Sequence, residues 1–247
     1  MTLNETIYRR KTTRKFDLTP LGDEVVTDIS NFIRTVKPLY RDIEIHYDYA
    51  GNEDVKTRVI DIIAPHYLVI SSENKDGYLT NVGFIFQQVD IYLQSIGLGS
   101  CWCGSAKLSA GMDTELEFVI AIAFGKPEAG KSPYRELSDF RRKELRKISN
   151  IADDKLEPAR LAPSSGNSQP WYFLSEDGTF HVYCVNLGVA KIKPFKKMFE
   201  KWNKIDIGIA LAHLYIAHPD TFEFFINPAV GSLKGYYYVG SIEEQSV

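Results

Sequence analysis

The chain has 247 residues, of which 44% are hydrophobic and 25% are charged, a composition typical of a soluble globular protein. Its formal net charge of −3 gives no support to a nucleic-acid-binding protein, which usually carries a strongly basic domain. The N-terminus lacks the apolar core of a signal peptide, and no run of about 18 apolar residues occurs. We therefore expect a cytoplasmic protein that makes no membrane contact.

Helix-like and strand-like patterns alternate along the chain. In the first half we expect a helix over 23–37, a strand over 43–49, a helix from Asn81 and a strand over 118–125. In the second half we expect a helix over 153–162, strands over 171–175 and 180–185, a helix over 206–218 and a strand over 236–242. The order indicates an α+β fold.

One octet occurs twice. "RRKTTRKF" at 9–16 and "RRKELRKI" at 141–148 share five of eight residues, and similar patterns of helices and strands follow each copy. We interpret this as an internal duplication with halves at 1–130 and 131–247, intertwined as one globular unit. The alternative is that mixed helix–strand proteins resemble one another at this coarse level.

The first octet contains a candidate phosphate site. In an extended backbone, Arg10, Thr12 and Arg14 point to the same side and present two guanidinium groups and a hydroxyl. Such a set suits a phosphate. A solvated helix end is the alternative. The second copy carries Glu144 where a hydroxyl would be needed, which indicates a decayed site.

A polar loop, "APSSGNSQPW" at 162–171, precedes the strand at 171–175. Ser164, Ser165, Asn167 and Gln169 offer donors and acceptors to a flat heterocycle, and Gly166 allows an unusual backbone conformation. A surface turn is the alternative use of such residues.

Together, the Arg-x-Thr-x-Arg-Lys-Phe segment and the polar loop resemble the FMN-dependent nitroreductase family. Two weaker matches are "GLGSCWCG" at 97–104 and "IAFGKP" at 122–127. Because the two main motifs lie in different halves, the chain is similar to the duplicated single-chain branch, the putative TM nitroreductases. The resemblance implies a nitroreductase-like fold, in which helices flank a β-sheet, and a monomer that acts as an intramolecular pseudo-dimer.

The resemblance also implies a single FMN site and one ruined site. The residues it places beside FMN are Arg10, Thr12, Arg14, Cys101, Trp102, Cys103, Gly104, Pro163, Ser164, Ser165, Asn167 and Gln169. Lys131 or Arg135 would add a charge at the phosphate. The implied activity is hydride transfer from NAD(P)H through FMN to a small-molecule electron acceptor, either nitroaromatic or quinone-like. No protein acid or base is implied.

Other interpretations of the function and of the lysine-rich segment remain open. "GKPEAGKS" at 125–132 satisfies the P-loop pattern after a predicted strand, which would make the chain a nucleotide-binding protein. A non-catalytic flavin-binding protein is a further alternative. Six lysines within 191–204 are typical of a solvated amphipathic segment, although they could also attract an anionic substrate, partner or surface.

The sequence shows no pattern typical of a metal site or of a set of disulfide bonds. Cys101, Cys103 and Cys184 are an odd number of cysteines and form no disulfide framework. No zinc-ligand spacing occurs among the cysteines and histidines. We expect no metal site and interpret the histidines as structural or surface residues.

Overall fold

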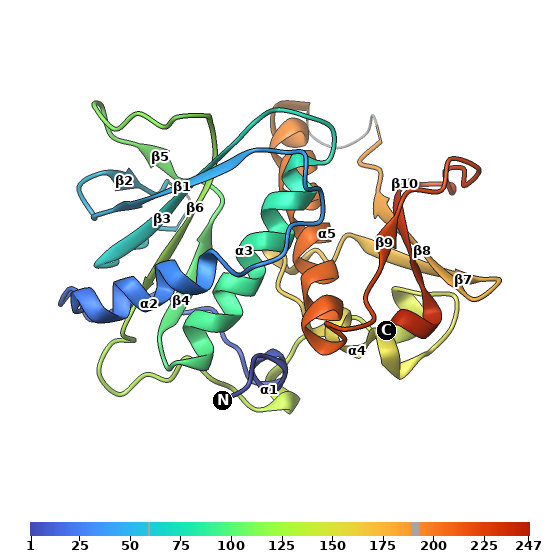
Figure 1. Ribbon diagram of the computed structural model, residues 1–247, viewed down its shortest axis with the longest axis horizontal. Helices are drawn as coiled ribbons and strands as arrows, with labels where there is room; N and C mark the ends of the chain where they lie inside the picture. The colour runs from blue at the N-terminus through green and yellow to red at the C-terminus, as the bar shows by residue number, and fades with distance from the viewer. Residues whose placement is uncertain (59, 189–192) are drawn as a thin grey trace. The chain divides into compact units, whose positions relative to one another are not determined.

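The computed structural model describes residues 1–58, 60–188 and 193–247, with only the backbone of Lys193, Pro194 and Ser246 (Figure 1). The chain divides into two compact units. Unit 1 comprises Met1–Tyr78 and Gln88–Asp139, and unit 2 comprises Leu79–Gln87 and Phe140–Val247. The long helix α3 (Tyr78–Ser95) therefore contributes its early turns to unit 2 and its late turns to unit 1.

Unit 1 is built on an antiparallel sheet with the strand order β1-β3-β6-β4. The strands are β1 (Ile45–Ala50), β3 (His66–Ser72), β4 (Gly99–Cys103) and β6 (Glu117–Gly125), and β2 (Val55–Lys56) pairs separately with β5 (Lys107–Leu108). The helices of this unit are α1 (Leu3–Ile7), α2 (Asp23–Ile33) and the short 3-10 helix η1 (Leu137–Asp139). The buried strands β3 and β6 are nearly continuous apolar runs, which places the core of unit 1 at the centre of this sheet.

Helix α2 begins with Asp23 and Glu24, whose negative charges suit the positive end of the helix dipole. It packs on β1 through a 2.9 Å hydrogen bond between the hydroxyls of Ser30 and Tyr49. The Phe32 ring stacks on Tyr92 of α3, with 4.0 Å between ring centroids.

Unit 2 contains a second antiparallel sheet with the order β7-β8-β10-β9. Its strands are β7 (Trp171–Glu176), β8 (Thr179–Val185), β9 (Phe224–Phe225) and β10 (Tyr236–Glu243). Its helices are α4 (Glu157–Leu161), α5 (Lys193–Ala217) and the 3-10 helices η2 (Leu145–Lys147), η3 (Asp154–Leu156), η4 (Ser165–Asn167) and η5 (Glu244–Ser246). Buried Phe173, Phe180 and Leu211 are part of its core.

The two sheets share one connectivity. In each unit, two consecutive strands form a pair, a long helix follows, and the last strand in sequence lies between that pair and the strand before it. In both sheets the central pairing is also irregular, between Ile70 and Ser71 in β3–β6 and between Tyr238 and Gly240 in β8–β10. The two sheets therefore match in topology and in the position of a bulge.

Within unit 2, α3 and α5 meet at a pair of glycines. A Cβ on Gly208 would lie 1.9 Å from the backbone oxygen of Thr80, and a Cβ on Gly83 would lie 2.1 Å from that of Ile205. Only glycine permits this backbone contact. Each glycine stands two residues after the first residue of its phrase, "NVG" from Asn81 and "DIG" from Asp206.

The α+β class is confirmed, while some element boundaries differ from expectation. Helix α2 ends at Ile33 rather than at 37, five residues before Pro38. The predicted helix over 153–162 is a 3-10 turn followed by the short α4. Helix α5 begins at Lys193, so most of the lysine-rich segment is helical; Lys191 and Ile192 lie outside the described residues.

The expected strands do not include β3 and β4, nor the two-residue strands β2, β5 and β9; Cys101 lies within β4.

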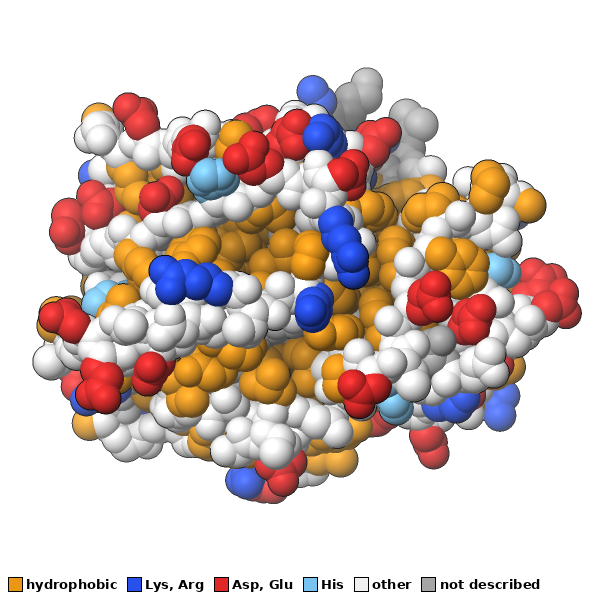
Figure 2. All heavy atoms as spheres, in the orientation of Figure 1, with side chains coloured by type: hydrophobic (Ala, Val, Ile, Leu, Met, Phe, Trp, Pro, Cys, Tyr) orange, Lys and Arg blue, Asp and Glu red, His pale blue; other side chains and the backbone are white. Residues whose placement is uncertain are grey.

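On the face drawn in Figure 2, Lys and Arg side chains are scattered rather than gathered into one broad patch. No helix of the described ranges is long and apolar enough to cross a bilayer.

Candidate functional site

The N-terminal basic segment of unit 1 is extended after α1 ends at Ile7. Thr12 and Ser100 form a parallel β-bridge, and the Thr13 N–H donates to the Ser100 carbonyl at 2.9 Å. A Cβ on Gly99 would lie only 2.5 Å from Thr13 Oγ1, so the start of β4 lies directly against this segment. The extended conformation expected for the octet is therefore confirmed, and the helix-end alternative is wrong.

Arg10 is held inside unit 1 by Asp90 of α3. Arg10 Nε lies 3.2 Å from Asp90 Oδ2, an ion pair rather than a well-aligned hydrogen bond, and the two side chains are 1% and 0% exposed. Arg10 Nη2 donates to Thr12 Oγ1 at 3.3 Å. The predicted association of Arg10 with Thr12 is thus present, but the guanidinium is almost completely covered.

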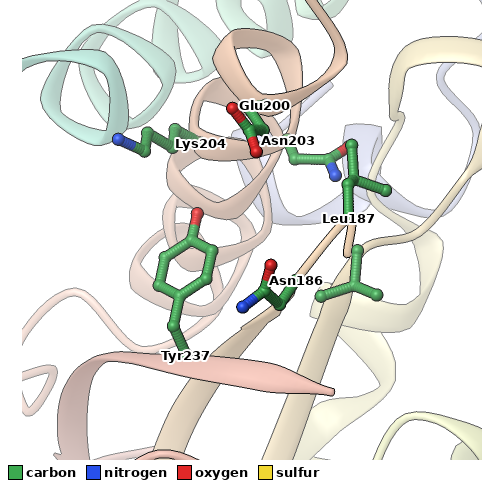
Figure 3. Close-up of a pocket in the computed structure, with 7 residues that line it drawn as sticks. Asn186, Leu187, Glu200, Asn203, Lys204 and Tyr237 are labelled. Carbon is green, nitrogen blue, oxygen red and sulfur yellow. The ribbon is translucent and has the colours of Figure 1, made fainter. Parts of the chain in front are cut away.

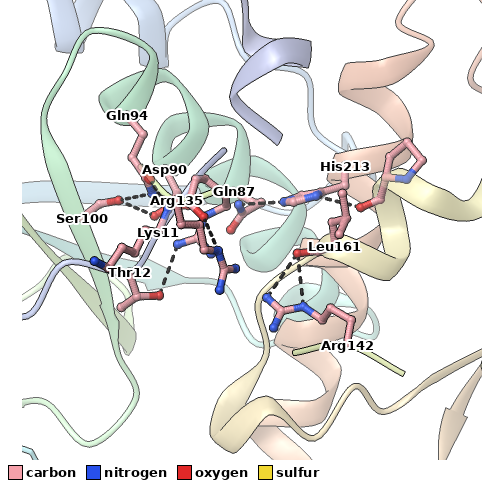
Figure 4. Close-up of polar contacts among 12 residues, drawn as sticks. Lys11, Thr12, Gln87, Asp90, Gln94, Ser100, Arg135, Arg142, Leu161 and His213 are labelled. Atoms are coloured by element: carbon pink, nitrogen blue, oxygen red, sulfur yellow. Dashed lines mark hydrogen bonds and ion pairs between the residues drawn. The ribbon is translucent and has the colours of Figure 1, made fainter. Parts of the chain in front are cut away.

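Asp90 is itself embedded in hydrogen bonds (Figure 4). Ser100 Oγ donates to Asp90 Oδ1 at 2.6 Å, and Gln94 Nε2 donates to Ser100 Oγ at 2.9 Å. Gln94 Oε1 accepts the backbone N–H of Lys11 at 2.9 Å. The C-terminal half of α3 therefore fixes both the Arg10 side chain and the backbone next to it.

Two more arginines bring positive charge to this region. Arg135 Nε donates to the Arg10 carbonyl at 3.0 Å, and burial, together with the charge of Arg10, lowers the pKa of Arg135 to about 10. Arg14 is exposed and makes no hydrogen bond or ion pair with another described residue. Lys131 is exposed as well, in the turn after β6.

Strand β4 carries the predicted residues Cys101–Cys103, with Gly104 just beyond. Cys101 and Cys103 are 5% and 4% exposed and belong to the apolar core around Tyr67. A hydrogen bond to Cys101 and burial raise the pKa of Cys103 well above its ordinary value, so Cys103 is a neutral thiol. Trp102 is half-buried and Gly104 is exposed.

The polar loop of unit 2 adopts an uncommon backbone conformation. Asn167 and Gln169 have φ values of 56° and 47°, and Gly166 has 57°. Non-glycine residues in this region are strained and cluster at functional sites. Gln169 is buried, Pro163, Ser164 and Ser165 are half-buried, and Asn167 is exposed.

The second basic octet holds this loop in place. Arg142 Nη1 donates to Asn167 Oδ1 at 2.7 Å, and the Lys143 N–H donates to Gln169 Oε1 at 2.7 Å. Lys143 Nζ also donates to the carbonyls of Ser168 and Gln169, at 2.9 and 2.8 Å. The octet was interpreted as a decayed phosphate site; the structure shows that it binds the polar loop.

Asp206 of α5 anchors the same loop from inside unit 2. The Ser165 N–H donates to both carboxylate oxygens of Asp206, at 3.0 and 3.2 Å, and Asp206 is 4% exposed. Burial raises the pKa of Asp206 well above its ordinary value, and the Ser165 N–H only partly opposes this shift.

Replacing Asp206 by asparagine should change how stability depends on pH. In the unfolded chain this carboxyl ionises near pH 4, whereas the folded protein retains the proton to higher pH. The wild type should therefore lose stability relative to Asp206→Asn as the pH rises above about 4, by at most about 1.4 kcal/mol per pH unit. Urea denaturation between pH 4 and 7 measures this difference. The exposed Asp220→Asn serves as the control, and a constant gap for Asp206→Asn would contradict the raised pKa.

The P-loop alternative is wrong. A P-loop leads directly into a helix whose N-terminal N–H groups cradle phosphates. Here Gly125 ends β6 in an antiparallel sheet, and residues 126–136 form turns and isolated bridges before η1 begins at Leu137.

One pocket of about 300 Å³ lies in unit 2, and none of the predicted site residues lines it (Figure 3). Its described lining comprises Val185, Asn186, Leu187, Glu200, Asn203, Lys204 and Tyr237. In the ranges 1–58, 60–188 and 193–247, no group of three His, Cys, Asp or Glu residues could hold a metal ion. Buried His213 bridges Gln87 and the Pro158 carbonyl, at 3.1 and 2.9 Å, which is a structural role.

Sequence reasoning missed the two residues that organise these segments, Asp90 and Asp206. The available signal was a carboxylate within an otherwise apolar helical run, "VDIYL" and "IDIGIAL". Buried charges are rare unless they are paired or hydrogen-bonded.

A family model described as "Putative TM nitroreductase" matches residues 2–218. A putative nitroreductase from Thermotoga maritima superposes with a TM-score of 0.65 at 18% identity, covering 98% of this chain and 94% of that one. No curated protein shows significant sequence similarity.

Two solved nitroreductases with bound FMN are more distant. The protein from Desulfitobacterium hafniense has a TM-score of 0.43 at 14% identity and covers 56% of this chain and 96% of that one. The protein from Bacteroides fragilis has a TM-score of 0.42 at 16% identity. The match covers 52% of this chain and 90% of that one.

Proposed function

Because the chain belongs to the family described as "Putative TM nitroreductase", we propose that it is an FMN-dependent oxidoreductase. It takes reducing equivalents from NAD(P)H and passes them to a small nitroaromatic or quinone-like acceptor. When bound, FMN supplies the hydride chemistry, and the protein binds and orients the cofactor. The acceptor class and the nicotinamide donor follow from the family resemblance.

The observation that carries this proposal is the excess of positive charge around the N-terminal segment of unit 1. Arg10, Arg14 and Arg135 bring three positive charges to it; Asp90 pairs with Arg10, and Asp139 acts on Arg135. A phosphate monoester is a dianion that prefers guanidinium and hydroxyl donors, so the residues present fit the phosphate of FMN. Arg10, Thr12 and Arg14 form this end of the site, with Arg135 rather than Lys131 as the additional charge.

The remaining predicted residues are assigned to the flavin ring and ribityl chain. Pro163, Ser164, Ser165, Asn167 and Gln169 belong to a loop held by the second octet and by Asp206, which suits a rigid polar surface for a heterocycle. Along β4, the buried thiols leave only the backbone, the Trp102 side chain and Gly104 to approach a ligand.

We also propose that the two units arose by duplication and form an intramolecular pseudo-dimer, with halves at 1–130 and 131–247. The common strand order, the common bulge and the matched glycines of α3 and α5 support this. The two octets then have different roles, one at the phosphate and one behind the polar loop. This division predicts one FMN site in a monomeric chain.

Reversing the charge of Arg14 tests the function. Arg14→Glu should weaken FMN binding about hundredfold, because a charge-assisted contact becomes a repulsion, while the fold stays intact. The visible absorbance spectrum of the purified protein, and the FMN bound per chain, measure the loss.

Lys15→Glu makes the same charge change at the adjacent exposed position and should retain FMN. Unchanged flavin content in Arg14→Glu would remove Arg14 from the site. A wild-type protein that stays flavin-free after incubation with FMN would contradict the function itself. Bound FMN that NAD(P)H does not reduce would instead indicate a non-catalytic flavin-binding protein.

A further inference from the structure

Arg10 and Thr12 differ in how much surface they offer to a ligand. The Arg10 side chain is 1% exposed, and its Nε faces the carboxylate of Asp90 at 3.2 Å. Thr12 is half-buried and keeps exposed surface. A phosphate that approaches the segment from solvent therefore meets Thr12 before it meets the Arg10 guanidinium.

The hydrogen bond between these residues has a defined direction. Arg10 Nη2 is the donor and Thr12 Oγ1 is the acceptor, because a guanidinium has no acceptor. Within the described part of the chain, Thr12 Oγ1 donates to no other residue. Its proton is available to a ligand, and the charge of Arg10 on its lone pair makes that proton a stronger donor.

Arg10 is in turn fixed from behind. Asp90 is 0% exposed, holds Arg10 Nε, and accepts from Ser100 at 2.6 Å (Figure 4). Arg10 therefore cannot swing outward without removing the cation from a buried carboxylate, which is costly.

We propose that Arg10 does not contact the cofactor phosphate directly but acts through Thr12: Asp90 orients Arg10, and Arg10 holds the Thr12 hydroxyl as a donor to the phosphate. Arg10 and Asp90 are positioning residues in this arrangement, and Thr12, with Arg14, binds the phosphate. The inference rests on the proposed function, because it concerns the phosphate end of the same cofactor.

The test compares FMN with riboflavin, which lacks the phosphate, in four proteins. These are the wild type, Thr12→Val, the pair variant Arg10→Met/Asp90→Asn, and the combination of all three changes. The pair variant removes one charge of each sign, so it leaves the net charge unchanged and avoids an unpaired buried carboxylate. Dissociation constants for both flavins come from fluorescence titration, and circular dichroism confirms that each variant is folded.

Thr12→Val should reduce the preference for FMN over riboflavin about tenfold to hundredfold, the value of a hydrogen bond to a charged group. The pair variant should reduce it in the same direction. The combination should lose no more preference than Thr12→Val alone, because Arg10 acts only through the hydroxyl.

If the loss of FMN preference in the combination equals the product of the losses in Thr12→Val and the pair variant, Arg10 binds the phosphate directly. That result would overturn the inference while leaving the proposed function intact. An unchanged preference in Thr12→Val would also overturn it. A wild type that binds neither flavin would overturn the proposed function and this inference together. If the pair variant fails to fold, Thr12→Ser decides instead: it should retain the FMN preference that Thr12→Val loses, and an equal loss in both would overturn the inference.

Discussion

Gly208→Ala should lower the free energy of unfolding by about 3 kcal/mol, at the upper end of the usual cost of overpacking. The new Cβ would lie 1.9 Å from the backbone oxygen of Thr80 and 2.6 Å from the backbone nitrogen of Phe84. Neither atom can move without a shift of α3. In an exposed helix the same substitution would stabilise by about 1 kcal/mol, so the sign of the effect identifies the helix contact.

Urea denaturation of Gly208→Ala measures this effect, and Gly231→Ala is the control in the same unit. A Cβ on Gly231 would meet nothing within 4 Å, so stability should change by less than about 0.5 kcal/mol. Gly83→Ala should resemble Gly208→Ala, because its Cβ would lie 2.1 Å from the oxygen of Ile205. A Gly208→Ala protein as stable as wild type would contradict the close backbone contact between α3 and α5.

Arg10→Met should lower the free energy of unfolding by about 3–5 kcal/mol, the usual cost of removing one member of a buried ion pair. The substitution leaves the carboxylate of Asp90, which is 0% exposed, without its cation. Adding Asp90→Asn should restore most of the stability, because the neutral amide can still accept the Ser100 hydroxyl proton. Thermal or urea denaturation in the absence of flavin separates this effect from cofactor binding.

Arg9→Met is the matched control one residue away. Arg9 forms an ion pair with Glu136 at 3.6 Å, but the two side chains are 51% and 79% exposed. Exposed pairs contribute about 0–1 kcal/mol, so this variant should remain close to wild type. Similar losses in Arg9→Met and Arg10→Met would contradict the buried pairing with Asp90.

The parts of this fold that the sequence predicts are those with a strong local period. The apolar face of α3 and the aromatic alternation around β8 each indicate their element directly. β3 escaped prediction because "HYLVISS" is buried on both faces and so shows no alternation. The early turns of α5 were not predicted because their lysines and aromatic residues do not form a simple apolar stripe.

The residues of the candidate site likewise fall into those that the sequence could suggest and those that it could not. Arg10, Thr12 and the polar loop could be named because their residue types point to phosphate and heterocycle binding. Asp90 and Asp206 could not, because their roles depend on contacts with segments that are distant in sequence. The role of Arg142 and Lys143 was likewise hidden, since two copies of one octet carry the same local signal and only the surrounding unit distinguishes them.

The membership of Leu79–Gln87 in unit 2 has a consequence for how the chain folds. The hydrogen bond from Thr80 to the Lys204 carbonyl closes a loop of 124 residues, and the glycine contact between α3 and α5 spans a similar distance. Long-range contacts of this kind slow folding, because loop-closure entropy must be overcome before the contacts form. During synthesis, the early turns of α3 therefore cannot make these contacts until α5 has left the ribosome.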